Sequence, residues 1–129
     1  DEGQVLAVVG ESGCGKSVTS LSIMQLVQAP QGQIVGGSIR FNTDEKDADG
    51  DNISYDIAKM PMKDMYKIRG KDITMIFQEP MTSLNPVFTI GYQLDEVMFI
   101  HYPETTKEQA KAHSIEMLNQ VGISMPERL

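Results

Sequence analysis

Apolar residues gather near the start of the chain in an unbroken run and then recur with helical or alternating spacing. Residues 4–9 are almost continuously apolar and partly β-branched, which predicts a strand buried on both faces. Over residues 16–27 the apolar positions recur every third residue, which predicts a helix. Residues 72–77 are rich in β-branched side chains and end in Phe77, so they predict a second, mostly buried strand.

Shorter elements are predicted around these two strands. Residues 37–42 alternate apolar and polar side chains, as a half-exposed strand does. Residues 44–56 predict an acidic loop, and residues 60–68 predict a short helix that Gly70 follows. Residues 78–86 contain two prolines and predict a turn-rich connector.

The last third of the chain predicts two amphipathic helices, over residues 89–101 and 105–121. Thr105 is the predicted N-cap of the second helix, and Glu108 three residues later completes a capping box. Gly122 is predicted to end this helix, because glycine readily takes the left-handed conformation found there. Strands and helices mixed in this order predict an α/β fold.

Composition narrows the class of protein. The chain has 129 residues, of which 40% are hydrophobic and 22% charged, as in ordinary globular domains. Its longest apolar run is too short to span a membrane, and no basic-then-apolar leader opens the sequence, so we expect neither a spanning helix nor a signal peptide. The net charge of −7 argues against nucleic acid as a partner, and the single cysteine, Cys14, suits a reducing cytosol.

Charge is also unevenly distributed along the chain. Residues 44–56 hold six acids and one base, whereas residues 59–71 hold five bases and one acid. We interpret this as a solvated acidic loop followed by a basic helix. A calcium-binding loop would need a glutamate where Ala58 stands, so calcium is excluded.

Residues 10–17 fit the phosphate-loop pattern G-x-x-x-x-G-K-[S/T], between a predicted strand and a predicted helix. Glycines let the backbone turn its N–H groups inward, and the helix N-terminus adds positive potential, so the loop is expected to cradle a polyphosphate. Lys16 is expected to reach the β- and γ-phosphates, Ser17 to offer its hydroxyl to Mg²⁺, and Val18 to offer its backbone N–H. The predicted nucleotide-binding residues are Gly10, Glu11, Ser12, Gly13, Cys14, Gly15, Lys16, Ser17 and Val18.

Hydrolysis by such a site usually needs a carboxylate at the end of a second buried strand. Asp95 and Glu96 lie within a predicted amphipathic helix, so we interpret both as surface charges. Gln78 follows the predicted strand 72–77, but an amide cannot neutralise Mg²⁺ and can only orient water or offer a neutral oxygen. No catalytic carboxylate is therefore identified.

Residues 76–86, Ile-Phe-Gln-Glu-Pro-Met-Thr-Ser-Leu-Asn-Pro, resemble the Q-loop of ATP-binding-cassette (ABC) ATPases. Together with the phosphate loop and Arg-Gly-Lys-Asp-Ile at 69–73, they resemble the ATP-binding subunits of oligopeptide, dipeptide and nickel importers over residues 3–125. The resemblance implies ATP and Mg²⁺ as cofactors, with Lys16 and Gln78 catalytic, and with Ser17 and Gln78 near the metal.

The same resemblance implies a partial P-loop NTPase core with part of an antiparallel β-subdomain and an α-helical subdomain. Residues 1–35 would supply the phosphate-loop strand and helix, residues 36–86 the β-subdomain strand, acidic loop and Q-loop strand, and residues 87–129 the helical subdomain. The implied partners are transmembrane permease subunits, a second ATP-binding subunit and, indirectly, a substrate-binding protein. The implied location is the cytoplasmic face of the cell membrane.

The family's signature motif, catalytic carboxylates and switch histidine have no counterpart in the sequence, so we expect a catalytically incomplete fragment. His101 and His113 lie in the helical region and are interpreted as surface or half-buried residues. The strand that carries the catalytic acids would lie between strands 4–9 and 72–77. Without it, we expect those two strands either to pair with each other or to make the chain self-associate.

Two alternatives stay open. The chain is another P-loop enzyme, such as a kinase, if residues 90–95 form a strand that presents Asp95 as the catalytic acid. It is a non-catalytic nucleotide-binding or docking module if it acts through the helices of residues 89–121 and its exposed methionines.

Overall fold

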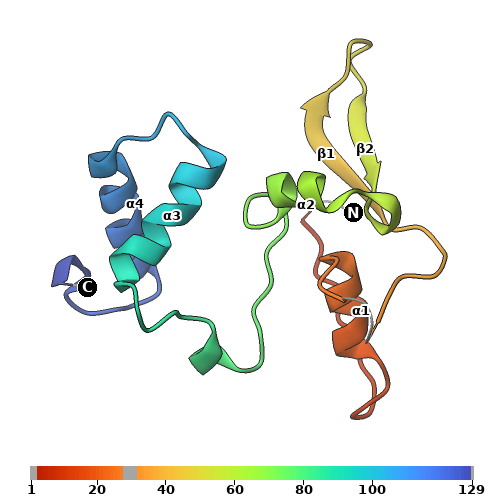
Figure 1. The fold of residues 1–129 in the computed structure, drawn as a ribbon, viewed down its shortest axis with the longest axis horizontal. Coiled ribbons are helices and arrows are strands. Elements are labelled where there is room, and N and C mark those ends of the chain that lie inside the picture. Colours follow the sequence, from red (N-terminus) through yellow and green to blue (C-terminus); the bar gives the residue numbers. More distant parts are fainter. Residues whose placement is uncertain (1–2, 28–31, 129) are drawn as a thin grey trace. The chain divides into compact units, whose positions relative to one another are not determined.

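The structure is a computed structural model that describes residues 3–27 and 32–128. The chain divides into two compact units, residues 1–73 and residues 74–129 (Figure 1). The predicted three-part division at residues 35 and 86 stays a prediction.

The first unit contains two short helices and a β-hairpin. Helix α1 spans Lys16–Ile23 and helix α2 spans Met62–Ile68. Strands β1 (Arg40–Lys46) and β2 (Asn52–Asp56) pair antiparallel, with Arg40 opposite Asp56. A 3-10 turn at Ile57–Lys59 joins the hairpin to α2. Both predicted helices of this unit are confirmed, although α1 ends at Ile23 rather than near residue 27.

The hairpin corrects the predicted acidic loop over residues 44–56. Much of that stretch is β-strand, and the predicted strand 37–42 is displaced to Arg40–Lys46. The turn is stabilised by Asp47, whose carboxylate accepts hydrogen bonds at 2.9 Å from the backbone N–H groups of Asp49 and Asp51. Gly50 follows with a φ of +85°, a conformation that suits glycine. Part of the acidic stretch that was interpreted as a solvated loop therefore forms a tight turn between two strands.

The hydrophobic core of the first unit lies where the hairpin meets α2. Ile57, Met65 and Ile68 form a buried cluster there. Half-buried side chains pack around the cluster; they are Ile39, Phe41, Met60 and Ile73. The core therefore joins the base of the hairpin to one face of α2.

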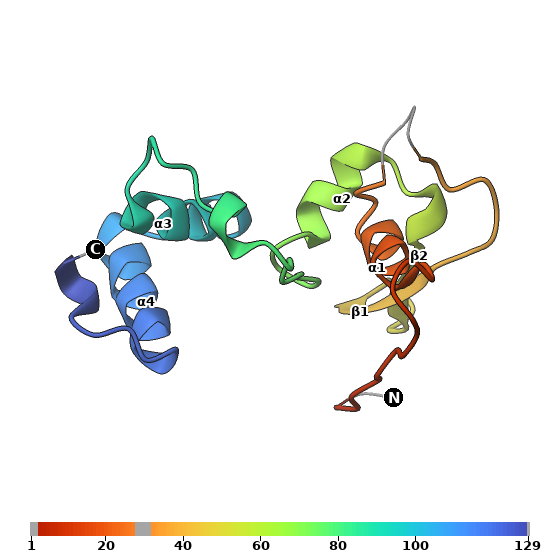
Figure 2. The ribbon, with the colours of Figure 1, turned by 90° about the horizontal axis from the view of Figure 1, so that it is seen from below.

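The two predicted buried strands are not formed, and this prediction is wrong. Residues 4–9 run from the N-terminal end as an extended segment without strand pairing (Figure 2), and Val5 is 96% exposed. Residues 72–77 make only an isolated parallel bridge through Ile73, and Ile76 is 97% exposed. Among the described residues, β1 and β2 form the one sheet. A strand that is apolar on both faces needs neighbours on both sides and covering layers, which this stretch of chain does not supply.

Self-association remains the expected consequence of the exposed apolar run at residues 5–9. A contiguous exposed apolar segment favours pairing with another chain. We expect the sedimentation coefficient to rise with protein concentration, and Val9→Lys to reduce that rise. Val121→Lys, at a site 73% exposed outside the run, is the matched control. A sedimentation coefficient independent of concentration in the wild-type chain would contradict the expectation.

The second unit contains two longer helices, α3 (Ile90–His101) and α4 (Lys107–Gln120). Short 3-10 turns lie at Pro80–Thr82 and Pro126–Arg128. Both predicted helices are confirmed. Thr89 caps α3, because its hydroxyl accepts a hydrogen bond from the N–H of Tyr92.

The start of α4 lies one residue later than the sequence predicts. The N-cap is Thr106, and Gln109 completes the capping box, in place of Thr105 and Glu108. The N–H of Thr105 instead bonds the carbonyl of Tyr102 in the preceding turn, which leaves Thr106 to begin the helix.

The predicted helix end at Gly122 is confirmed. Its φ is +82°, and its N–H bonds the Asn119 carbonyl while the N–H of Ile123 reaches the Leu118 carbonyl, both at 3.0 Å. This pattern of two bonds is a Schellman motif. Glycine at this position avoids the strain that a Cβ would bring.

Helices α3 and α4 contact each other through a small polar pair. Ser114 is buried, and its hydroxyl donates a 2.6 Å hydrogen bond to the carboxylate of half-buried Asp95. Ala110, one turn earlier on α4, is fully buried. The interpretation of Asp95 as a surface charge is therefore wrong, whereas exposed Glu96 agrees with it.

Candidate functional site

The phosphate-loop segment folds as a compact turn that leads into α1. The N–H of Cys14 bonds the Glu11 carbonyl at 3.3 Å and closes the turn. Gly13 and Gly15 have φ values of +79° and +96°, which only glycine adopts without strain. Gly15 is the N-cap of α1, so the helix begins at Lys16 as the sequence predicts.

Lys16 folds back across the mouth of this loop. Its ammonium nitrogen Nζ lies 2.5 Å from the Gly10 carbonyl oxygen and 2.6 Å from that of Glu11. The same nitrogen lies 3.4 Å from the sulfur of Cys14. The positive charge of Lys16 therefore lies where the loop opens. Its hydrogen bonds to the two backbone carbonyls can be exchanged for bonds to water, because the loop is exposed.

Gly10 is required by a close approach within the loop. A Cβ at this position would collide with the Cys14 sulfur and would also lie 3.7 Å from the Lys16 side chain. A side chain at this position would therefore displace the Cys14 sulfur, whereas 3.7 Å is an ordinary contact distance to Lys16. Gly10 therefore leaves room for the Cys14 sulfur, whereas Gly13 and Gly15 provide the left-handed backbone of the loop.

The first turn of α1 supplies backbone donors next to the loop. The first helical bond runs from the N–H of Thr19 to the Gly15 carbonyl at 2.9 Å. The N–H groups of Lys16, Ser17 and Val18 precede that bond, and helix geometry gives such groups no partner inside the helix. Ser17 and Val18 are also exposed. The loop and the helix terminus thus offer an anion a set of backbone donors and one ammonium group.

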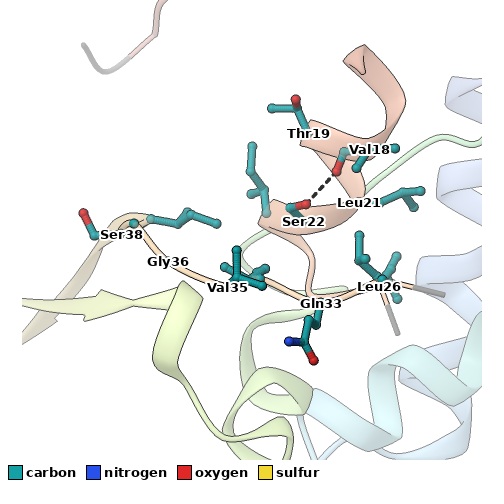
Figure 3. Close-up of a pocket in the computed structure, with 15 residues that line it drawn as sticks. Val18, Thr19, Leu21, Ser22, Leu26, Gln33, Val35, Gly36 and Ser38 are labelled. Atoms are coloured by element: carbon teal, nitrogen blue, oxygen red, sulfur yellow. Dashed lines mark hydrogen bonds between the residues drawn. The ribbon is translucent and has the colours of Figure 1, made fainter. Parts of the chain in front are cut away.

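A groove of about 1000 Å³ lies beside α1 (Figure 3). Val18, Leu21 and Ser22 line it from the helix, and Leu26 and Val35 from the following segment. The Ser22 hydroxyl is occupied by a 2.7 Å bond to the Val18 carbonyl. Because none of the described lining residues carries a charge, this groove lacks the chemistry of a phosphate site.

Gln78 lies in the second unit, whereas the phosphate loop lies in the first. Its side chain is exposed, just before the 3-10 turn at Pro80–Thr82. The structure therefore describes the loop residues 10–18 as one site, and a role for Gln78 beside that site stays a prediction.

The connector after Gln78 is organised by a residue that the sequence analysis missed. The amide oxygen of Gln93 accepts a 2.8 Å bond from the N–H of Asn85, and its amide nitrogen donates to the carbonyls of Asn85 and Phe88 at 3.0 and 3.1 Å. Gln93 thereby ties the Leu-Asn-Pro turn to the first turn of α3. A glutamine eight residues after the turn gives no sequence signal of such a contact.

The structure also decides one of the open alternatives. Residues 90–95 belong to α3, and Asp95 accepts a bond from Ser114, so Asp95 is not an acid at the end of a strand. The kinase alternative, which requires that strand, is therefore wrong. His101 is half-buried and His113 is exposed, as expected from the sequence.

Comparison with known proteins identifies the family. Residues 1–128 match the ABC transporter family. The chain belongs to this family. Its P-loop NTPase fold class and its resemblance to importer ATP-binding proteins are thereby confirmed, although the parallel strands of such a core are absent from the described residues. ABC ATPase domains bind nucleotide, and in importers they work with permease components.

Individual relatives agree with this assignment. The chain is 46% identical over 128 residues to the oligopeptide transport ATP-binding protein OppD of Bacillus subtilis, covering 99% of this chain and 32% of that protein. It is 43% identical over 129 residues to the dipeptide transport ATP-binding protein DppD of the same organism, covering 99% of this chain and 35% of that protein. The peptidoglycan transport ATP-binding protein YejF of Agrobacterium fabrum is 45% identical over 126 residues, covering 98% of this chain and 21% of that protein.

The chain spans about a third of the length of the oligopeptide and dipeptide relatives. No solved structure matches it. Within the residues that the structure describes, no helix combines the length and apolar character needed to cross a membrane.

Proposed function

We propose that this chain is part of the ATP-binding subunit of an ABC importer that takes up peptides. The observation that carries the proposal is the placement of the Lys16 ammonium group across the mouth of a loop that leads into a helix N-terminus. The peptide cargo is supported by the relatives, which are named for oligopeptide and dipeptide transport.

The residues of the loop fit the triphosphate of ATP. Lys16 exchanges its bonds to the Gly10 and Glu11 carbonyls for phosphate oxygens, which are stronger acceptors because they carry charge. The N–H groups of loop residues 11–13 and 15 and of the first turn of α1 hold the remaining oxygens, whereas the Cys14 N–H closes the turn. The negative charge of the bound nucleotide would balance the Lys16 charge, whereas the neutral carbonyls of Gly10 and Glu11 only accept hydrogen bonds from it.

The donor set also fits Mg²⁺. This ion keeps several waters and commonly takes few protein ligands beside nucleotide phosphates. On the proposal, the Ser17 hydroxyl, exposed in the first turn of α1 next to the loop, is one such ligand, and the Gln78 amide oxygen is another. When bound, Mg²⁺ would supply charge neutralisation of the phosphates. Lys16 and Ser17 orient the triphosphate for that purpose.

On this proposal the complete protein lies at the cytoplasmic face of the membrane. There it acts with permease subunits and a second ATP-binding subunit, and a substrate-binding protein delivers the peptide. The present residues bind nucleotide without turning it over, because a neutral amide at Gln78 cannot replace a catalytic carboxylate.

Titration calorimetry and a phosphate-release assay test the proposal together. We expect the 129-residue chain to bind MgATP and to release phosphate no faster than a buffer blank. Gln78→Ala should weaken MgATP binding more than binding of ATP in EDTA, because the amide acts through the metal. Gln33→Ala, another exposed glutamine, is the matched control. Absence of MgATP binding by the wild-type chain would overturn the proposal.

The cargo is tested in the complete transporter. A strain lacking the full-length gene should lose uptake of a labelled tripeptide, and the wild-type gene should restore it while a Lys16→Ala gene does not. Unchanged peptide uptake with lost nickel uptake would contradict the peptide assignment.

A further inference from the structure

The helix that carries Lys16 and Ser17 is not held in place by a buried face. Helix α1 has eight residues, and none of them is buried. Helices of this length are marginal without tertiary packing, so their direction depends on the contacts at their ends. The N-terminal end of α1 is the exposed phosphate loop. The nearest buried residue is Met24, which directly follows the C-terminal end of the helix, so the contacts that orient the helix are expected there.

That C-terminal end has an unusual backbone conformation. Gln25 has a φ of +50°, which is uncommon for residues other than glycine and costs free energy. The N–H of Gln25 bonds the Ser22 carbonyl at 3.0 Å, and the N–H of Leu26 bonds the Leu21 carbonyl at 2.8 Å. This is a Schellman motif with glutamine where glycine is usual. A strained non-glycine residue persists where its surroundings hold it.

Arg69, which follows α2, supplies the first part of that hold. Its Nε donates to the Met24 carbonyl and its Nη2 to the Gln25 carbonyl, each at 2.7 Å. These are carbonyls at the end of α1, where the helix dipole is negative and a cation is favoured. The planar guanidinium group bonds both at once, which fixes direction as well as distance.

The side chain of Gln25 supplies the second part. Its amide nitrogen donates to the Met60 carbonyl at 2.7 Å and to the Ile57 carbonyl. Ile57 belongs to the buried cluster of the first unit, and Met60 packs against that cluster. Met24 itself is buried. The end of α1 is thus tied to the core in two ways: its backbone carbonyls accept hydrogen bonds from Arg69, and the Gln25 side chain donates hydrogen bonds to carbonyls of the core segment.

We propose that Arg69 and Gln25 are positioning residues for the phosphate loop. They anchor the C-terminal end of α1 to the core and thereby set the direction in which the other end presents Lys16, Ser17 and the loop amides. The inference rests on the proposed nucleotide binding for its functional consequence. The anchor itself is a property of the fold and is tested separately.

Hydrogen exchange read by mass spectrometry tests the anchor. Arg69→Met removes the guanidinium group and keeps an unbranched apolar stem. We expect amides in α1 to exchange about tenfold faster, because the free energy lost with a hydrogen bond to a charged group corresponds to at least about a tenfold change in an equilibrium. Amides in β1 and β2 should keep their protection. Arg40→Met makes the same substitution at an exposed arginine of β1 and should leave α1 unchanged.

Two further variants separate positioning from general loss of folding. Arg69→Lys keeps the charge with a single ammonium group and should restore part of the protection. Gln25→Gly removes the side-chain bonds while easing the positive φ, so the helix end is kept but its tie to the core is lost. We expect faster exchange in α1 for this variant as well, with the hairpin again unaffected.

Nucleotide binding gives the functional readout. We expect the Kd for MgATP to rise about tenfold in Arg69→Met and Gln25→Gly, with Arg40→Met equal to wild type. Unchanged exchange in α1, or equally increased exchange in α1 and the hairpin, overturns the inference, as does an unchanged Kd in variants whose α1 is deprotected. A wild-type chain that binds no nucleotide defeats the proposed function, and the exchange data then still decide whether the anchor exists.

Discussion

Lys16→Ala is expected to raise the Kd for MgATP about a hundredfold, because it removes the full positive charge that Lys16 holds at the mouth of the phosphate loop. The Lys16 ammonium group lies within 2.6 Å of two loop carbonyls and is therefore already close to where phosphate oxygens would lie. Little reorganisation is needed before the charge is used.

The same substitution should hardly change stability. Lys16 contacts exposed carbonyls, and water satisfies them when the side chain is removed. Surface substitutions of this kind usually change the free energy of unfolding by no more than about 0.5 kcal/mol. A large loss of affinity with an unchanged unfolding transition is therefore the expected combination.

Lys63→Ala is the matched control, since it removes the same charge from an exposed position in α2. Binding by titration calorimetry should be equal to wild type for the control. Measurements at two salt concentrations separate the local contact from the general repulsion between an anionic nucleotide and a protein of net charge −7, because only the repulsion is screened strongly. A loss below about fivefold in Lys16→Ala would show that the loop amides dominate phosphate binding.

The features that the sequence predicted best are those set by local chemistry. The glycine spacing and Lys16 predict the loop because the left-handed conformations at Gly13 and Gly15 depend on residue type. The helix end at Gly122 follows from the same property. Helices α1 to α4 follow from local apolar periodicity, with ends displaced by a few residues, since competing caps such as Thr105 and Thr106 differ little in sequence.

The features that were missed depend on distant parts of the chain. The run at residues 4–9 has the composition of a buried strand, but a strand forms only with partners and covering layers. In the acidic stretch, charge suggested a loop, whereas Asp49-Gly50 is a hairpin signal that the charge concealed. The tie between Arg69 and the end of α1 spans 45 residues, so no local pattern could predict it.

Met65→Ala is expected to destabilise the first unit by about 2–5 kcal/mol. Met65 is fully buried and forms the hydrophobic cluster together with Ile57 and Ile68. Half-buried side chains surround this small cluster and can partly refill the cavity, so the loss should lie toward the lower end of that range.

Met62→Ala, on the same helix at a position 40% exposed, is the matched control and should cost much less. Chemical denaturation followed by hydrogen exchange would measure both effects. In Met65→Ala we expect the hairpin and α2 to lose protection together, while α3 and α4 keep theirs because they belong to the other unit. Equal stability of the two variants would show that the cluster does not hold the unit together.

The consequence for nucleotide binding separates this variant from Lys16→Ala. Ile68 immediately precedes Arg69, and Ile57 contributes a carbonyl to Gln25, so loosening the cluster releases the contacts at the end of α1. Met65→Ala should therefore weaken both stability and MgATP binding, and ATP at saturating concentration should restore part of the lost stability by linkage. Lys16→Ala should weaken binding alone. If Met65→Ala lost stability but kept full affinity, the phosphate loop would have to hold its conformation without the core of the first unit.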